Sequence, residues 1–103
     1  MRRWLSSAEK IERLVRGLNS WPGAYTFMNG KMLKIWASEV TGREAQGEAG
    51  TVAGTDKKSI FVNCGEGVLA LNEVQYEGKK RMSTQAFLLG AKVEPGQKLT
   101  AER

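Results

Sequence analysis

The spacing of hydrophobic residues changes from a helical period to strict alternation about a fifth of the way along the chain. In residues 6–18 apolar side chains recur at intervals of three and four, which predicts an amphipathic helix with one buried stripe. Ser6 with Glu9 has the spacing of a capping box, and Ser7 is the alternative N-cap. The stripe consists of Ala8, Ile11, Leu14, Val15 and Leu18.

The polar face of this helix carries two charge pairs at i, i+4, Glu9 with Arg13 and Glu12 with Arg16. For Arg13 we favour a solvated, internally paired role. Gly17 is placed to adopt the left-handed backbone conformation that ends many helices.

The segment after the helix predicts a sharp turn. Pro22 and Gly23 form a strong turn pair, because proline fixes its φ angle and glycine tolerates a positive one. Trp21 lies directly before them, and it is either a packing anchor or an exposed stacking face.

From residue 24 onward the apolar residues alternate, which predicts β-strands. Residues 24–28 and 31–40 are expected to form a hairpin, because the Asn-Gly pair between them is typical of a two-residue turn. In the second strand, alternate residues face the core or the opposite side of the sheet. The expected core set is Leu33, Ile35 and Ala37, and the opposite set is Lys34, Trp36 and Ser38.

Further strands are predicted at residues 51–53, 59–64 and 68–75, after a polar loop at residues 41–50. In the last of these strands, one face is expected to carry Leu69, Leu71 and Glu73.

The C-terminal part predicts a second, shorter helix. Ser83 is the expected N-cap of a helix over residues 84–89, and Gly90 ends it. A last strand is expected around residues 98–99.

Together these elements predict a mainly β fold in a single domain over residues 1–103. Five to six short strands favour a small barrel, with one helix before the first strand and a short helix after the fifth. Five strands in Greek-key order would form an oligonucleotide-binding (OB) fold, but alternation alone does not determine strand order.

Composition narrows the function further. The chain contains no histidine and one cysteine, Cys64, so the common general base and the usual zinc ligand sets are missing. We expect no catalytic site, no metal site and no cofactor, and we expect Cys64 to be a small buried residue. A lone cysteine and the lack of a long apolar run are consistent with a cytoplasmic protein that does not span a membrane.

The net charge of +5 favours a partner that carries phosphate groups. Lys31 and Lys34 lie near Trp36, and residues 79–81 form a second basic cluster. Cations interleaved with aromatic rings are typical of nucleic-acid surfaces. The alternatives are an ordinary solvated strand face for the lysines, a covering role for Trp36, and a solvated loop for the second cluster.

Six short motifs in register resemble the C-terminal domain of methionyl-tRNA formyltransferases over about ninety residues. Each motif is weak by itself, but their shared order is specific. They are Arg-Gly-Leu-Asn-x-Trp-Pro-Gly-Ala-Tyr-Thr at residues 16–26, Asn-Gly-Lys with Leu-Lys-Ile-Trp at 29–36, Gly-Thr-Val at 50–52, Gly-Glu-Gly at 65–67, Gly-Lys-Lys-x-Met-Ser at 78–83, and Phe-Leu-x-Gly at 87–90 with Pro-Gly at 95–96.

The resemblance implies an OB-like barrel that belongs beside a separate formyl-transferring catalytic domain, which is absent from this chain. In the family the catalytic Asn, His and Asp lie in that other domain, so this chain is not expected to be an enzyme by itself. The implied role is to hold the initiator methionyl-tRNA, as a monomer, through backbone contacts that do not recognise base sequence. The implied tRNA-binding residues are Arg16, Lys31, Lys34, Lys79, Lys80 and Arg81.

Two alternatives remain open. The barrel is a scaffold that packs on the catalytic domain and contacts little RNA, or it belongs to a related enzyme that acts on nucleotide-sugar or folate substrates. An exposed apolar patch around Trp21 or Leu18 would favour the scaffold role.

Overall fold

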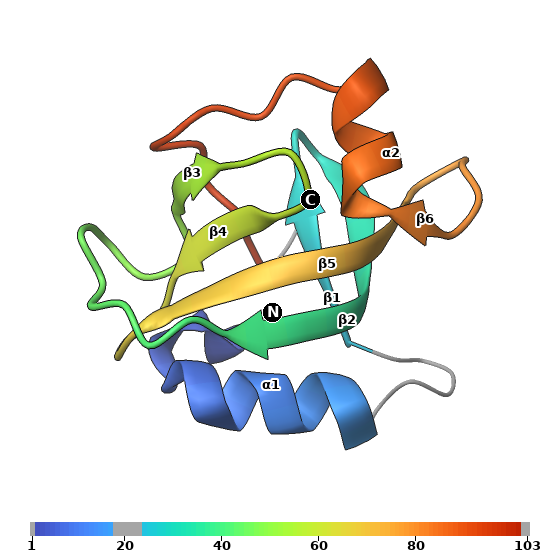
Figure 1. Ribbon diagram of the computed structural model, residues 1–103. Coiled ribbons are helices and arrows are strands. Elements are labelled where there is room, and N and C mark those ends of the chain that lie inside the picture. The colour runs from blue at the N-terminus through green and yellow to red at the C-terminus, as the bar shows by residue number, and fades with distance from the viewer. Residues whose placement is uncertain (1, 18–23, 102–103) are drawn as a thin grey trace.

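The computed structural model describes residues 2–17 and 24–101. It contains one antiparallel sheet, a helix along one side of it and a second helix beside the last strand (Figure 1). The elements in chain order are η1 Arg2–Leu5, α1 Ala8–Gly17, β1 Ala24–Met28, β2 Lys31–Val40, β3 Val52–Thr55, β4 Ile60–Asn63, β5 Val68–Tyr76, β6 Met82–Ser83 and α2 Thr84–Gly90.

The predicted first helix is present, but its N-cap is Ser7. The backbone N–H of Lys10 donates to Ser7 Oγ at 3.3 Å, so Ser7, not the capping-box residue Ser6, accepts the bond typical of an N-cap. Gly17 is the last residue of α1 and does not have a positive φ angle, so its predicted left-handed conformation is wrong. The predicted turn at Pro22 and Trp21 lies outside the described residues, as does Leu18.

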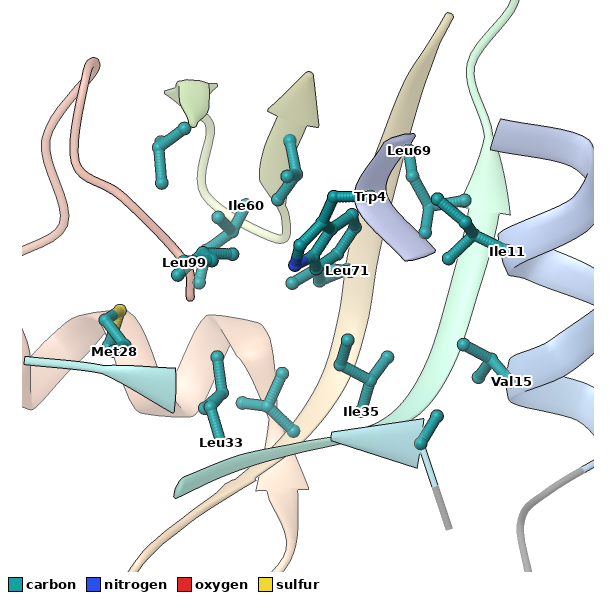
Figure 2. Close-up of a cluster of buried hydrophobic side chains, with 14 of the residues drawn as sticks. Trp4, Ile11, Val15, Met28, Leu33, Ile35, Ile60, Leu69, Leu71 and Leu99 are labelled. Atoms are coloured by element: carbon teal, nitrogen blue, oxygen red, sulfur yellow. The ribbon is translucent and has the colours of Figure 1, made fainter. Parts of the chain in front are cut away.

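The apolar stripe of α1 packs against the sheet as predicted. Ala8, Ile11 and Val15 are buried, and the helix contacts β2 and β5. Figure 2 shows Ile11 and Val15 pointing from α1 toward Leu69 and Ile35.

The sheet follows the order β1-β2-β5-β4-β3, with β6 paired to β5. The hairpin between β1 and β2 forms as predicted, and both turn residues have positive φ angles, 54° at Asn29 and 76° at Gly30. β5 pairs with both β2 and β4, so it lies at the centre of the sheet.

The predicted mainly β class, strand number and two helices are confirmed, but the sheet is not closed into a barrel. Instead, the C-terminal segment lies between the two edge strands and makes isolated bridges, from Thr100 to Phe27 in β1 and from Lys98 to Thr51 beside β3. The last strand expected at residues 98–99 therefore exists only as these single bridges.

A β-bulge interrupts the pairing of β2 with β5 and changes which of their residues face the core. Leu33 and Ile35 are fully buried as predicted, but the pairing register shifts around Ala37. Beyond this shift, Val74 points into the core and Glu73 pairs with Arg81 at the surface, so the prediction that Glu73 shares the face of Leu71 is wrong.

The main core lies between the inner face of the sheet, α1, α2 and the C-terminal segment. Trp4 of η1 is 3% exposed and packs in this core (Figure 2). Its indole N–H donates to Thr26 Oγ1 at 3.2 Å, which satisfies the polar atom of a buried ring. Cys64 is 1% exposed in the same core, as predicted.

The second helix also forms as predicted. The side chain of Ser83 accepts a hydrogen bond from the backbone N–H of Ala86 at 3.1 Å, which makes Ser83 the N-cap. Phe87 is buried and its ring meets that of Tyr76 edge to face at 5.6 Å. This helix packs against the C-terminal end of β5, where the loop at residues 77–81 begins.

Candidate nucleic-acid interface

The outer face of β2 carries a cation and an aromatic ring side by side. Because Leu33 and Ile35 point inward, Lys34 and Trp36 lie on the opposite face, as the alternation predicted. The Nζ atom of Lys34 lies 3.9 Å from the centroid of the Trp36 ring. This cation–π contact fixes a lysine over a half-buried indole.

A second cation reaches the same ring from a distant part of the sequence. The guanidinium of Arg81 lies 4.2 Å from the Trp36 centroid. The two basic clusters, which the sequence separates by more than forty residues, therefore meet at Trp36. The π surface under these cations is already occupied, which favours the covering interpretation of Trp36 over an open stacking face.

Arg81 also forms an ion pair with Glu73 on β5. Nε lies 2.8 Å from one carboxylate oxygen and Nη2 lies 2.9 Å from the other, the fork geometry that arginine favours with carboxylates. The hydrogen bonds from Arg81 lower the pKa of Glu73, and those to Glu73 raise the pKa of Arg81. This ion pair is not evident from the sequence, because the β-bulge near Ala37 decides which face of the sheet Glu73 occupies.

We call residues 77–81, which join β5 to β6, the basic loop. The backbone N–H of Lys79 donates to the carbonyl oxygen of Tyr76 at 2.9 Å, and Gly78 supplies the positive φ of 83° that this turn needs. Lys79 and Lys80 are exposed. The loop therefore presents two adjacent ammonium groups to solvent from an ordered turn.

Gln75 connects the basic loop to Trp36. Its Oε1 accepts a hydrogen bond from the indole Nε1–H at 3.1 Å, and its Nε2 donates to the carbonyl oxygen of Lys79 at 3.2 Å. No local pattern in the sequence singles out this glutamine, because its role depends on the strand pairing of Lys34 with Gln75 across β2 and β5.

Lys31 lies beside the same loop, at the start of β2. The backbone N–H of the next residue, Met32, donates to Glu77 Oε1 at 3.0 Å, and the N–H of Glu77 donates to the carbonyl oxygen of Met32 at 2.8 Å. This pair of bonds holds the hairpin end of β2 against the basic loop, with Lys31 exposed next to it.

Arg16 is on a separate element from the other implied residues. It lies in the last turn of α1, where its Nε is 2.7 Å from Glu12 Oε2, so the predicted Glu12–Arg16 pair is present. The predicted Glu9–Arg13 pair does not form. The structure thus places Lys34 and Arg81 over Trp36, and Gln75 ties the loop that carries Lys79 and Lys80 to the same ring. Lys31 lies beside that loop at the start of β2, and Arg16 is on a separate helix with its own partner.

Within residues 2–17 and 24–101, no three side chains of His, Cys, Asp or Glu gather as metal ligands. Burial raises the pKa of the Cys64 thiol to about 11, so this thiol is a poor nucleophile near neutral pH. No helix in the same part of the chain is long and apolar enough to cross a membrane.

The fold and this surface define a mainly β module with a basic region built around one tryptophan. A family model described as the formyl transferase C-terminal domain matches residues 3–92. The chain therefore belongs to the formyl transferase C-terminal domain family, as its motifs suggested.

Several methionyl-tRNA formyltransferases are similar in sequence to this chain. The methionyl-tRNA formyltransferase of Agathobacter rectalis is 47% identical over 93 residues, covering 90% of this chain and 30% of that protein. The methionyl-tRNA formyltransferase of Bacillus subtilis is 46% identical over 94 residues, with the same shares covered. That of Geobacter metallireducens is 43% identical over 96 residues, 93% of this chain and 30% of that protein. The chain spans about 30% of the length of these relatives.

Proposed function

We propose that this chain positions the initiator methionyl-tRNA while a separate catalytic domain formylates it. The observation that carries the proposal is the convergence of Lys34 and the basic loop at Trp36, with Lys31 beside them. The relatives' name, methionyl-tRNA formyltransferase, supports methionyl-tRNA as the phosphate-bearing partner.

The proposed contacts are electrostatic. Lysine ammonium groups bind phosphates as point charges and displace condensed counterions, which supplies affinity that falls with salt. Lys31, Lys34, Lys79 and Lys80 would contact phosphate and sugar, and such contacts orient an RNA without recognising its sequence.

The two arginines would contribute less. Arg81 reaches the same surface, but Glu73 already occupies its guanidinium. Arg16 would be a peripheral contact, because it is paired with Glu12 on α1.

In this role the chain acts as a monomer in the cytoplasm, supplies no catalytic group and needs no cofactor. Its second partner is the formyltransferase catalytic domain. The buried Cys64 and the lack of a metal cluster among the described residues are consistent with a binding role.

A second candidate is a scaffold that docks on the catalytic domain and contacts little RNA. The observation that favours it is Leu5 of η1, a large apolar side chain that is 78% exposed. The patch around Trp21 or Leu18 that would favour this role lies outside the described residues.

An NMR titration separates the two. We expect initiator tRNA to shift the backbone amide signals of Lys31, Lys34 and the basic loop, while those of the exposed turn at residues 56–58 stay in place. If tRNA shifts no signals, and the catalytic domain of the Bacillus subtilis relative shifts those around Leu5, the scaffold role is correct and the proposal fails.

A further inference from the structure

Both backbone polar groups of Lys79 are held by the protein. Its N–H donates to the carbonyl oxygen of Tyr76 at 2.9 Å, and its carbonyl oxygen accepts from Gln75 Nε2 at 3.2 Å. The first bond closes the turn itself, and Gly78 allows it. The second bond fixes how the peptide between Lys79 and Lys80 is oriented.

The orientation of the Gln75 amide is set by Trp36. An indole N–H only donates, so the amide oxygen must face it, and the amide nitrogen is then directed to the Lys79 carbonyl oxygen. Glutamine suits this place because one planar group supplies an acceptor on one side and a donor on the other. A glutamate would keep the bond to the indole and lose the bond to the loop.

Trp36 is itself a firm anchor. It lies on the central part of β2, is half buried, and carries Lys34 and Arg81 over its ring. The two hydrogen bonds of Gln75, to Trp36 and to Lys79, therefore hold the basic loop in a fixed position relative to the sheet. Without it, two adjacent lysines that repel each other would have to be ordered when an RNA binds, which costs affinity.

We propose that Gln75 is a positioning residue for RNA binding: it holds the main chain of Lys79, and thereby the Lys79–Lys80 pair, in the conformation that meets the phosphate backbone. This inference rests on the proposed function. It adds a neutral side chain, which contacts no RNA itself, to the residues that determine affinity.

The test measures binding of initiator tRNA to the whole chain across a salt series. The variants are Gln75→Ala and, as reference, Lys79→Ala with Lys80→Ala. At about 0.1 M salt we expect Gln75→Ala to bind about threefold to tenfold more weakly, with a shallower dependence of log K on log salt. A shallower slope without loss of a charge is the signature of misplaced lysines, and lost stability alone would not produce it.

Gln97→Ala is the matched control. Gln97 Nε2 donates to Asn29 Oδ1 at 3.2 Å, so the control also removes a glutamine that joins two segments, away from Trp36. We expect it to change neither affinity nor slope. A second test variant, Trp36→Phe, keeps a ring under the cations and removes the indole N–H, and we expect a smaller change in the same direction as Gln75→Ala.

The outcomes separate the inference from the proposed function. If the double lysine variant flattens the slope and Gln75→Ala leaves it unchanged, the lysines bind RNA and the positioning role of Gln75 is wrong. If the double lysine variant itself changes nothing, the proposed function fails, and the inference fails with it.

Discussion

Arg81 donates two hydrogen bonds to Glu73, from Nε and Nη2 at 2.8 and 2.9 Å from the two carboxylate oxygens. This pairing explains how three adjacent cations are tolerated in one short loop, since the third has a partner on β5. Lys79 and Lys80 are the two other cations of the basic loop, and both are exposed.

Replacing Glu73 tests how far its ion pair keeps Arg81 from binding RNA. We predict that Glu73→Gln strengthens tRNA binding about threefold to tenfold at low salt, because a phosphate can then pair with Arg81, and that the salt slope steepens by about one phosphate contact. Binding titrations at several salt concentrations measure both quantities.

The control for this change is Glu94→Gln. It removes the same charge beside another cation, since Glu94 Oε1 lies 3.2 Å from Lys92 Nζ. An equal gain in affinity from both variants would show that net charge alone, and not the release of Arg81, is responsible.

The Arg81–Glu73 ion pair is expected to make the stability of the fold depend on pH. Arg81 lowers the pKa of Glu73 below its ordinary value of 4.5, so the pair's contribution to stability is present above that value and is lost as the pH falls through the lowered pKa. Carbon NMR of the Glu73 carboxylate should show this low midpoint, and Arg81→Met should return it toward 4.5. A midpoint that does not move in the variant would contradict the assigned cause.

Gly65 is expected to resist substitution. A Cβ atom there would overlap the backbone carbonyl group of Leu5, and Gly65 N–H donates to the carbonyl oxygen of Trp4 at 2.7 Å. We predict that Gly65→Ala lowers the free energy of unfolding by about 1–3 kcal/mol, because backbone must move to admit the methyl group. Gly90→Ala, where a Cβ meets no atom within 4 Å, should be neutral or slightly stabilising in the same chemical denaturation experiment.

The Thr26 hydroxyl links three parts of the chain. It accepts from the indole of Trp4 and donates to the carbonyl oxygen of Thr100 at 2.9 Å, while Thr26 itself is fully buried. Thr26→Val keeps the shape and leaves both partners without this hydroxyl, so we predict a loss of about 1–3 kcal/mol in the free energy of unfolding. Combining it with Trp4→Phe should cost less than the sum of the two single changes; strict additivity would show that the two side chains are not coupled.

Local patterns were sufficient for much of the fold. The Asn29-Gly30 hairpin and the Ser83 cap are determined by a few adjacent residues, and alternation placed Leu33 and Ile35 in the core because one face of that strand is buried. Where the pairing shifts at Ala37, alternation no longer assigns faces correctly, and Glu73 was misplaced for that reason.

The interface was harder to predict because it depends on strand pairing. The cations themselves were recognisable from the sequence, but their meeting at Trp36 follows from the neighbouring positions of β2, β5 and β6. Gln75 and Glu73 have no local signal at all, since their partners lie on other elements. The open sheet, bridged by residues 98–100, likewise depends on contacts across the whole chain.

The most direct measurement compares two matched lysine pairs for their effect on tRNA binding across a salt series. Lys79 with Lys80 and Lys57 with Lys58 are both adjacent and exposed, and replacing either pair by alanine removes the same charge. We predict that loss of Lys79 and Lys80 weakens binding and flattens the salt slope by about two phosphate contacts, while loss of Lys57 and Lys58 has little effect. Equal slopes for the two variants, or no binding by the unaltered chain even at low salt, would contradict a tRNA-positioning role for the basic loop.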